Sequence, residues 1–310
     1  SDDELPDAPA VIRDASIVVG DALRVDESLD AGTLIDAHGV ADVNPTSDAG
    51  PRCFEMAPGY AKQLCLKPWI QELTRQRGAA EALCLAEDLL EQGEVTDCHL
   101  LAHFVGEVVF EQQGGDAAQS LVACPPTCLS GCGHQVMQEV VEARELNAVF
   151  REQGSAAVDA ELRALIGLCR AYEGDNVDQF ALCVHGIGHG LLSSGFLGPI
   201  EAAELCEDEL GVEGLPCASG VFMEHTSRYI RLQEDRLLER LPTICDFGGS
   251  HWEDLCWRNV GEALMWFYGH RLEQATIVCN RLSNGDVSKA CREGAEAEAG
   301  VADMQRNSCP

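Results

Sequence analysis

The chain has 310 residues, which is enough for one large domain or two ordinary ones. Its 52 acidic and 21 basic residues give a formal charge of −31, and so acidic a chain argues against nucleic acid or an anionic membrane as a partner. No stretch reaches the roughly 18 apolar residues of a membrane-spanning helix, and no basic segment followed by an apolar run opens the chain, so we expect a mature form from which any export signal has been removed.

Residues 1–52 differ in composition from the rest of the chain. They contain ten aspartates but neither cysteine nor lysine. The segments ASIVVGDALRV and GTLIDAHGVADV have the β-branched character of strands. Because two short strands are seldom stable alone, we predict an acidic, extended, partly β-like arm. It could dock on its own chain, which is the simpler alternative, remain free, or add a strand to a neighbouring molecule.

From residue 53 to residue 310 the cysteines follow a repeating pattern. The members of five pairs lie 11 to 14 residues apart, and the first members recur every 34 to 45 residues, with a sixth pair of shorter spacing. That period is typical of tetratricopeptide-type helical hairpins that stack into solenoids, although the similar spacings could be coincidence. We therefore predict an all-α domain, a solenoid-like stack of about six hairpins closed by the disulfides Cys84–Cys98, Cys124–Cys132, Cys169–Cys183, Cys206–Cys217, Cys245–Cys256 and Cys279–Cys291.

The number of cysteines indicates the compartment. Sixteen are more than cytosolic proteins usually carry unless they bind zinc or an iron–sulfur cluster. Such sites need CxxC pairs, and the sequence contains none. Disulfides in an oxidising compartment, extracellular or periplasmic, are therefore the better interpretation. For the four remaining cysteines we expect the bonds Cys53–Cys65 and Cys128–Cys309, although spacing alone leaves their pairing open.

Histidines recur at the start of the predicted second helices. His99 and His103 are four residues apart, as are His185 and His189, so each pair would share one helical face, and His134 lies in the repeat between them. One such pair supplies two of the three or four ligands that a transition metal needs. If consecutive second helices line one face, the sequence predicts a site for one or two ions of copper, zinc or iron, built from His99, His103, His134, His185, His189 and Glu224.

Ordinary helix packing is the alternative explanation of these residues. A single histidine pair of this spacing is often an accident of a surface or core, whereas matching pairs in nearby repeats favour a site. Gly186, Gly188 and Gly190 each cost a helix about 1 kcal/mol, which indicates close contact with a neighbouring helix or with a ligand. Covalent haem would need CxxCH, which CLSGCGH only approaches. Haem held by two histidines stays possible but has no supporting motif.

The segments CHLLAHFVG, CLSGCGH, CVHGIGHG and CASGVFMEH occur in this order. They resemble motifs of a group of secreted prokaryotic proteins that are rich in cysteine and histidine. The resemblance covers about residues 84–230, and more loosely the later repeats. It implies that the six candidate ligands belong to one shared site, but it implies no activity. His225 stands where we expect an asparagine in that pattern.

Three functions are compatible with the sequence. The first, which we favour because solenoids more often bind or scaffold than catalyse, is a non-catalytic building block that holds a structural or stored metal. It would form a homo-oligomer or filament through residues 1–52, or bind another protein. The second is a metal-dependent secreted enzyme, using copper or iron for redox chemistry or zinc for hydrolysis. The third is a haem or metal carrier. No nucleotide-binding glycine loop, GxSxG or HExxH motif identifies a reaction.

Overall fold

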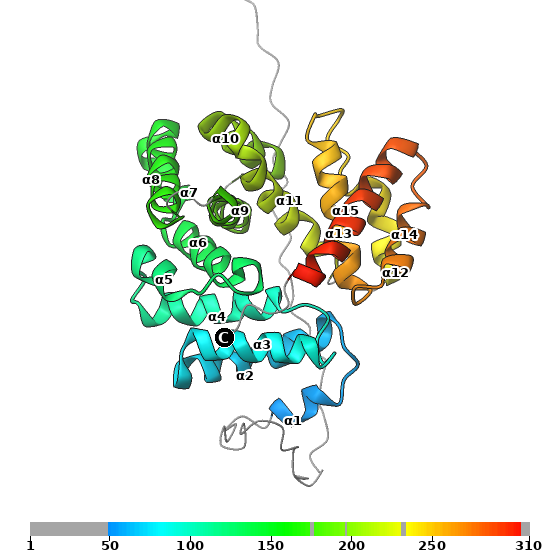
Figure 1. The fold of residues 1–310 in the computed structure, drawn as a ribbon. Coiled ribbons are helices and arrows are strands. Elements are labelled where there is room, and N and C mark those ends of the chain that lie inside the picture. The colour runs from blue at the N-terminus through cyan, green and yellow to red at the C-terminus, as the bar shows by residue number, and fades with distance from the viewer. Residues whose placement is uncertain (1–48, 174–176, 196, 231–233, 305–310) are drawn as a thin grey trace, which may run out of the picture. The chain divides into compact units, whose positions relative to one another are not determined.

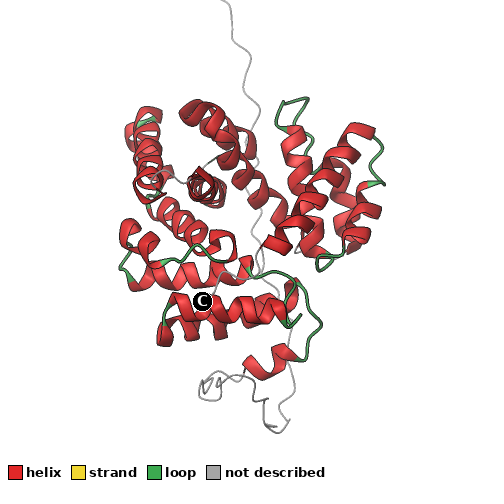
Figure 2. Cartoon of the chain, in the orientation of Figure 1, coloured by secondary structure: helices red, strands yellow, loops and turns green. Residues whose placement is uncertain are grey.

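The computed structural model describes residues 49–173, 177–195, 197–230 and 234–304. Within these residues the protein is all-α, as the cysteine repeat predicted, and contains no strand (Figure 2). The arm predicted for residues 1–52 lies outside the described residues, except that its last residues belong to α1 (Ala49–Phe54). No helix in the described part of the chain is both long and apolar enough to cross a lipid bilayer.

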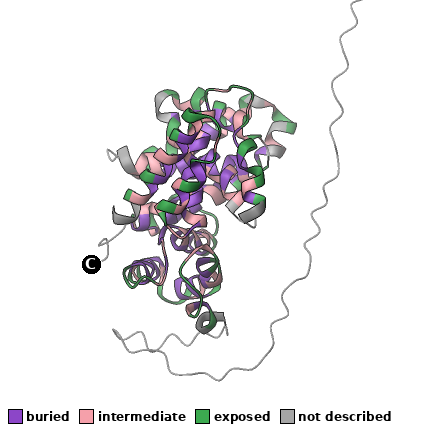
Figure 3. Ribbon diagram, turned by 90° about the vertical axis from the view of Figure 1, so that its right-hand side faces the viewer, coloured by how far each residue is buried: buried purple, intermediate pink, exposed green. Residues whose placement is uncertain are grey.

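A row of helices, each packed against the next in chain order, forms the centre of the fold, and we call it the inner row (Figure 1). Its members are α2 (Tyr60–Arg77), α4 (His99–Gln112), α6 (Gly131–Ala143), α9 (Val177–Ser193), α11 (Leu215–Ile230), α13 (Glu253–Phe267) and α15 (Gly285–Met304). Buried residues follow the faces along which these helices meet (Figure 3). The candidate histidines lie on α4, α6 and α9, three consecutive members of the row.

A second set of helices packs against the inner row, each one just before its partner in the chain. They are α3 (Ala79–Glu91), α5 (Ala117–Ala123), α8 (Ser155–Glu173), α10 (Pro199–Leu210) and α14 (Leu272–Cys279), and the remaining helices are α7 (Leu146–Gln153) and α12 (Glu234–Arg240). These pairs are the predicted helical hairpins. The hairpin that ends in α13 differs, because the residues just before Cys245 form a short 3-10 helix, η3 (Leu241–Thr243), and not an α-helical turn.

Glycines let the inner helices approach backbone to backbone. A Cβ atom on Gly188 of α9 would overlap the carbonyl oxygen of Cys217 on α11, and one on Gly220 of α11 would overlap that of His185. A Cβ atom on Gly186 would lie 2.6 Å from the carbonyl oxygen of His134 on α6. Close contact with neighbouring helices therefore explains the glycines that are unfavourable for a helix. It also brings the side chains of adjacent inner helices together.

Disulfides join the ends of neighbouring helices. The structure contains Cys53–Cys65, Cys98–Cys128, Cys124–Cys132, Cys169–Cys183, Cys206–Cys217, Cys245–Cys256 and Cys279–Cys291. Two of our predicted bonds, Cys84–Cys98 and Cys128–Cys309, are wrong because Cys98 is bonded to Cys128. Cys84 is also disulfide-bonded, and Cys309 lies outside the described residues.

The unexpected bond has a packing reason. Cys128 lies in another short 3-10 helix, η1 (Cys128–Ser130), immediately before α6. The start of α6 packs directly on the start of α4, since a Cβ atom on Gly131 would lie 2.7 Å from the carbonyl oxygen of His99. This contact places the Cα atoms of Cys98 and Cys128 5.5 Å apart, within the ordinary range for a disulfide. The bond therefore links two successive hairpins and does not close one of them.

Candidate metal centre

The first turn of α4 presents His99 in a fixed orientation. The carboxylate of Asp97 accepts hydrogen bonds from the backbone N–H groups of His99 and Leu100, at 2.8 and 3.2 Å. This arrangement satisfies donors that a helix start leaves free. The ring of His99 is then held from the other side, because its Nδ1 lies 3.0 Å from the carbonyl oxygen of Cys128. His103 follows one helical turn later on the same face.

The turn that supplies the Cys128 carbonyl has an unusual backbone. Cys128, Leu129 and Ser130 have φ values of 49°, 53° and 54°. This left-handed conformation costs a residue other than glycine roughly 1–2 kcal/mol. The disulfides Cys98–Cys128 and Cys124–Cys132 tie the turn to the starts of α4 and α6. Backbone strain of this kind is concentrated at functional sites. Here the strained turn directs the carbonyl group of Cys128 toward His99.

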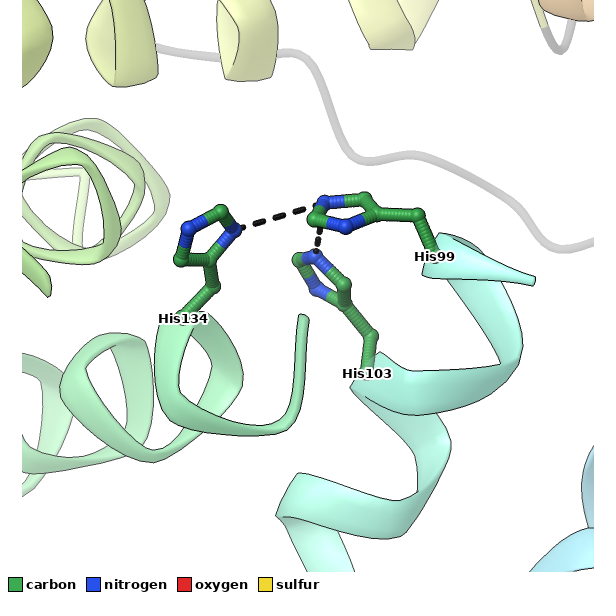
Figure 4. Close-up of side chains that lie close together, drawn as sticks. All are labelled: His99, His103 and His134. Carbon is green, nitrogen blue, oxygen red and sulfur yellow. Dashed lines mark hydrogen bonds between the residues drawn. The ribbon is translucent and has the colours of Figure 1, made fainter. Parts of the chain in front are cut away.

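His99, His103 and His134 form a compact triad (Figure 4). The Nε2 atoms of His99 and His103 lie 3.0 Å apart, and Nδ1 of His134 lies 3.3 Å from Nε2 of His99. One nitrogen from each ring can be chosen so that all three lie within 4.8 Å of one another. Two nitrogens bound to one tetrahedral zinc ion are about 3.3 Å apart, given Zn–N bonds of about 2.0–2.1 Å. The triad therefore has the spacing of a metal site.

The hydrogen-bond partners fix which ring nitrogens carry protons. Nδ1 of His99 must donate to the carbonyl of Cys128, which only accepts. The amide nitrogen of Gln135 donates to Glu139 at 2.9 Å, so its oxygen, 3.0 Å from Nδ1 of His103, accepts from that ring. Both Nε2 atoms then hold lone pairs, and these face each other at 3.0 Å. Two facing lone pairs repel each other, and a metal ion that both nitrogens coordinate would remove this repulsion.

Burial keeps the triad in the form that binds metals. Removal from water lowers the pKa of His99, and it lowers the pKa values of His103 and His134 well below the usual value for histidine. Neighbouring imidazoles lower all three further. The rings are therefore neutral at pH 7, and neutral imidazole is the metal-binding species.

The second histidine pair lies against the first. On α9 the Nε2 atoms of His185 and His189 are 3.1 Å apart, and Nδ1 of His185 lies 3.1 Å from the carbonyl oxygen of Pro216. Oε2 of Glu224, on α11, is 3.5 Å from Nδ1 of His189. The ring centres of His134 and His185 are 5.0 Å apart. The structure therefore brings all six predicted ligands together, from four consecutive inner helices.

A cavity of about 410 Å³ opens onto the histidines. The inner row curves so that helices from α2 to α13 line this one space, with His99, His103 and His189 on its wall. Lys67 and Glu107, paired at 2.7 Å, and the ring of Trp266 line it as well. Cavities of this size accommodate small molecules. A metal ion at the triad would accordingly be open to a further ligand from one side.

Few features of the sequence indicate the residues that support the triad. Asp97 lies two residues before His99, in DCH, and Gln135 directly follows His134, in GHQ. Only this closeness in sequence to a candidate ligand could have indicated their role. Lys67, Glu107 and Trp266 come from helices whose approach to the site depends on the curvature of the row. No local pattern predicts that curvature.

The other histidines in the described part of the chain lie outside the cluster. Nε2 of His225 donates to the carbonyl of Ile244 at 2.9 Å, and its ring packs against Tyr229. His251 is exposed beside Glu207, with Nε2 3.3 Å from the carboxylate. His270 follows α13, in the turn before α14.

Comparisons of the chain with models of protein families, with curated proteins and with solved structures found no match. The resemblance to secreted proteins rich in cysteine and histidine therefore stays a prediction. What the chain and its geometry establish is a disulfide-rich helical protein with a buried histidine triad that could hold a metal ion.

Proposed function

We propose that this protein binds a transition metal ion through His99, His103 and His134. The observation that carries the proposal is the pair of Nε2 lone pairs 3.0 Å apart, each ring having its Nδ1 proton committed to a carbonyl oxygen. Metal-binding histidines characteristically donate their other nitrogen in this way, which fixes the ring and strengthens it as a ligand. Three imidazole ligands suit zinc, copper or iron, with a remaining position directed toward the cavity.

The disulfides support an oxidising compartment for this function, extracellular or periplasmic. Thiols are kept reduced in the cytosol, where so many structural disulfides would be exceptional. The same bonds fix the starts of α4 and α6 and hence the spacing of the triad. We therefore expect metal to bind the oxidised protein and to be lost when the disulfides are reduced.

The test is elemental analysis of the natively exported protein, purified without chelators and without a histidine tag. We expect at least one equivalent of zinc, copper or iron per chain, and the equivalent that the triad holds should be lost in the His99→Ala/His103→Ala variant. The matched control is His251→Ala, which removes an exposed histidine that pairs with Glu207 and packs against Trp252 and should retain the full metal content. Metal content that is nil, or equal in both variants, would overturn the proposal.

The cavity favours catalysis or small-ligand binding as a second candidate function. A purely structural metal is usually enclosed by four protein ligands, whereas His99 and His103 stand on the wall of a 410 Å³ space. Cobalt(II) loaded into the triad would report an added ligand through its visible spectrum. A spectral change with azide, absent in the triad variant, would support an open coordination position, and an unchanged spectrum would contradict it.

Self-assembly through residues 1–52 stays a prediction, since nearly all of that segment lies outside the described residues. Deleting residues 1–48 and measuring the mass in solution before and after would test it. Binding of haem also stays a prediction, and a colourless protein after growth with haem would contradict it.

A further inference from the structure

We propose that the histidines form a centre for two metal ions, with the ring of His134 bridging them. This inference rests on the proposed function, because the triad is the first of the two sites. His185 and His189 would hold the second ion, together with the nitrogen of His134 that the triad does not use.

His134 lies between the two histidine pairs. It belongs to α6, which packs between α4 and α9 in the inner row. Its ring centre is 4.9 Å from that of His99 and 5.0 Å from that of His185. The two pairs also meet directly, since the ring centres of His103 and His189 are 5.9 Å apart. His134 is therefore placed almost symmetrically between a pair on each side.

The two nitrogens of His134 have different surroundings. Nδ1 faces the triad, 3.3 Å from Nε2 of His99. Nε2 is buried and has no hydrogen-bond partner among the described residues, although the side chain is only 2% exposed. A buried polar atom normally has a partner. A second metal ion supplies the partner that this atom lacks.

The second pair repeats the geometry of the first. In each pair the leading histidine donates its Nδ1 proton to a backbone carbonyl, Cys128 for His99 and Pro216 for His185. In each pair the two Nε2 atoms face each other, at 3.0 and 3.1 Å. The facing Nε2 atoms and the carbonyl bond of the leading histidine are thus present twice, whereas Nδ1 of His189, unlike that of His103, has no hydrogen-bond partner among the described residues. Glu224, 3.5 Å from Nδ1 of His189, adds a negative charge that favours a cation there.

The two sites differ in compactness. In the described part of the chain, the triad is the only cluster of three or more histidine, cysteine or acidic residues whose ligand atoms all lie within 4.8 Å of one another. The second set must tighten around its ion, which costs binding energy. We therefore expect the triad to fill first and the second site to bind more weakly.

Bridging has a definite proton balance. A neutral imidazole carries one N–H proton, and coordination at both nitrogens displaces it to solvent. Filling the second site therefore releases one proton from His134 and leaves an imidazolate between the two ions. The oxidation state of the metal does not change, so no oxidant or reductant is needed.

The test is titration of the metal-free, disulfide-intact protein with Cu(II), followed by equilibrium dialysis and electron paramagnetic resonance. We expect two bound equivalents. The first should give the signal of an isolated Cu(II) ion, and the second should replace it by the spectrum of an exchange-coupled pair. The His185→Ala/His189→Ala variant should bind half as much copper and keep the isolated signal, while His251→Ala should behave as the unmodified protein.

Each other outcome is decisive. One equivalent in the unmodified protein would overturn the second site and leave the triad intact. Two equivalents without magnetic coupling would overturn the bridge. Copper retained in full by the double variant would show that the second equivalent binds elsewhere and would also overturn the proposal. No bound copper at all would overturn the proposed function itself.

Discussion

The histidine end of the inner row and its carboxyl-terminal end share one backbone arrangement but carry different buried side chains. Gly188 of α9 and Gly261 of α13 each meet a backbone carbonyl of the next inner helix, at a distance that leaves no room for a side chain. His189 and Glu262 stand at equivalent positions, six residues after the disulfide cysteine of their helices. The two ends therefore place different side chains, imidazoles at one and carboxyl groups at the other, on the same repeated backbone.

Burial has opposite consequences for the two kinds of side chain. It lowers the pKa of His134 and keeps the ring neutral, with a lone pair for a metal. It raises the pKa of Glu262 to about 7, and burial together with the nearby Asp97 and Glu262 raises the pKa of Glu298 well above its usual value. The carboxyl-terminal end thus holds protons where the histidine end is arranged to hold metal. The residue type at the inner position decides the chemistry.

Removing the disulfide Cys98–Cys128 should have the largest effect, and it should affect both stability and metal binding. In the chain-entropy account a bond that spans 30 residues contributes about 3.5 kcal/mol to the free energy of unfolding. Its loss also frees the turn whose carbonyl orients His99. We therefore expect the Cys98→Ser/Cys128→Ser variant to bind metal at least about 10-fold more weakly, as measured by competition with a chelator of known affinity.

The matched control is Cys279→Ser/Cys291→Ser at the other end of the row. That bond spans 12 residues and contributes about 3 kcal/mol in the same account. It joins α14 and α15, which carry no candidate ligand, so metal affinity should be unchanged while urea unfolding shows a similar loss of stability. Equal losses of metal affinity in both variants would mean that the triad depends on global stability and not on the Cys128 turn.

The two ends should give the metal-free protein opposite pH dependences. Glu262 has a folded-state pKa of about 7 against 4.5 when unfolded, so the unfolded chain ionises first as pH rises. The free energy of unfolding should then fall by up to about 3 kcal/mol between about pH 4.5 and 7. His103, His134 and His185 have folded-state pKa values below 6.5, so the unfolded chain takes up protons first and stability falls as pH drops below 6.5.

Substitutions separate the two effects. Glu262→Gln should reduce the loss of stability between about pH 4.5 and 7, leaving the part that comes from Glu298, and should leave the loss on the acid side unchanged. His134→Gln should reduce the acid loss and leave the other. Urea unfolding at intervals from pH 4 to 8 measures both. A single variant that flattened both limbs would show that the two ends do not titrate independently.

The helical hairpins could be predicted because the sequence signals for them are local, and the packing of the hairpins against one another does not change them. Cysteine spacing and apolar periodicity identified the hairpins because each hairpin is a local unit. The bond Cys98–Cys128 was missed because it joins two hairpins across a turn with three left-handed residues, none of them glycine. The residue types at positions 128–130, Cys-Leu-Ser, do not indicate a left-handed conformation.

The candidate ligands were also predictable, but their grouping was not. The spacing of His99 and His103, and of His185 and His189, put each pair on one helical face. Whether the pairs would meet depended on how closely α4, α6 and α9 pack, and glycine in a helix pattern indicates close contact without naming the partner. The role of Gln135 depends on the tautomer of His103, which only the hydrogen-bond network reveals.

Glycine substitutions at the two ends should have effects of intermediate size. Gly188→Ala and Gly261→Ala both place a Cβ atom against a carbonyl of the next helix, and overpacking of this kind costs about 1–3 kcal/mol. Gly188→Ala should also weaken copper binding at His185 and His189, whereas Gly261→Ala should not. Apart from the backbone of its own helix, Gly167 in α8 has no heavy atom within 4 Å of its Cβ position, so Gly167→Ala should leave stability unchanged or raise it by up to about 1 kcal/mol.

The smallest expected effect concerns Trp266, which lies on the cavity wall and belongs to the carboxyl-terminal end. Its Nε1 donates to Glu298 at 2.9 Å, and Trp266→Phe removes that bond while keeping an aromatic ring. The free energy of unfolding should fall by about 1 kcal/mol, and the pKa of Glu298 should rise further because the lost bond favours its ionised form. Metal content should not change, since the triad and its carbonyl partners lie on other helices. A loss of metal in this variant would show that the two ends communicate through the cavity and that the division between them is not real.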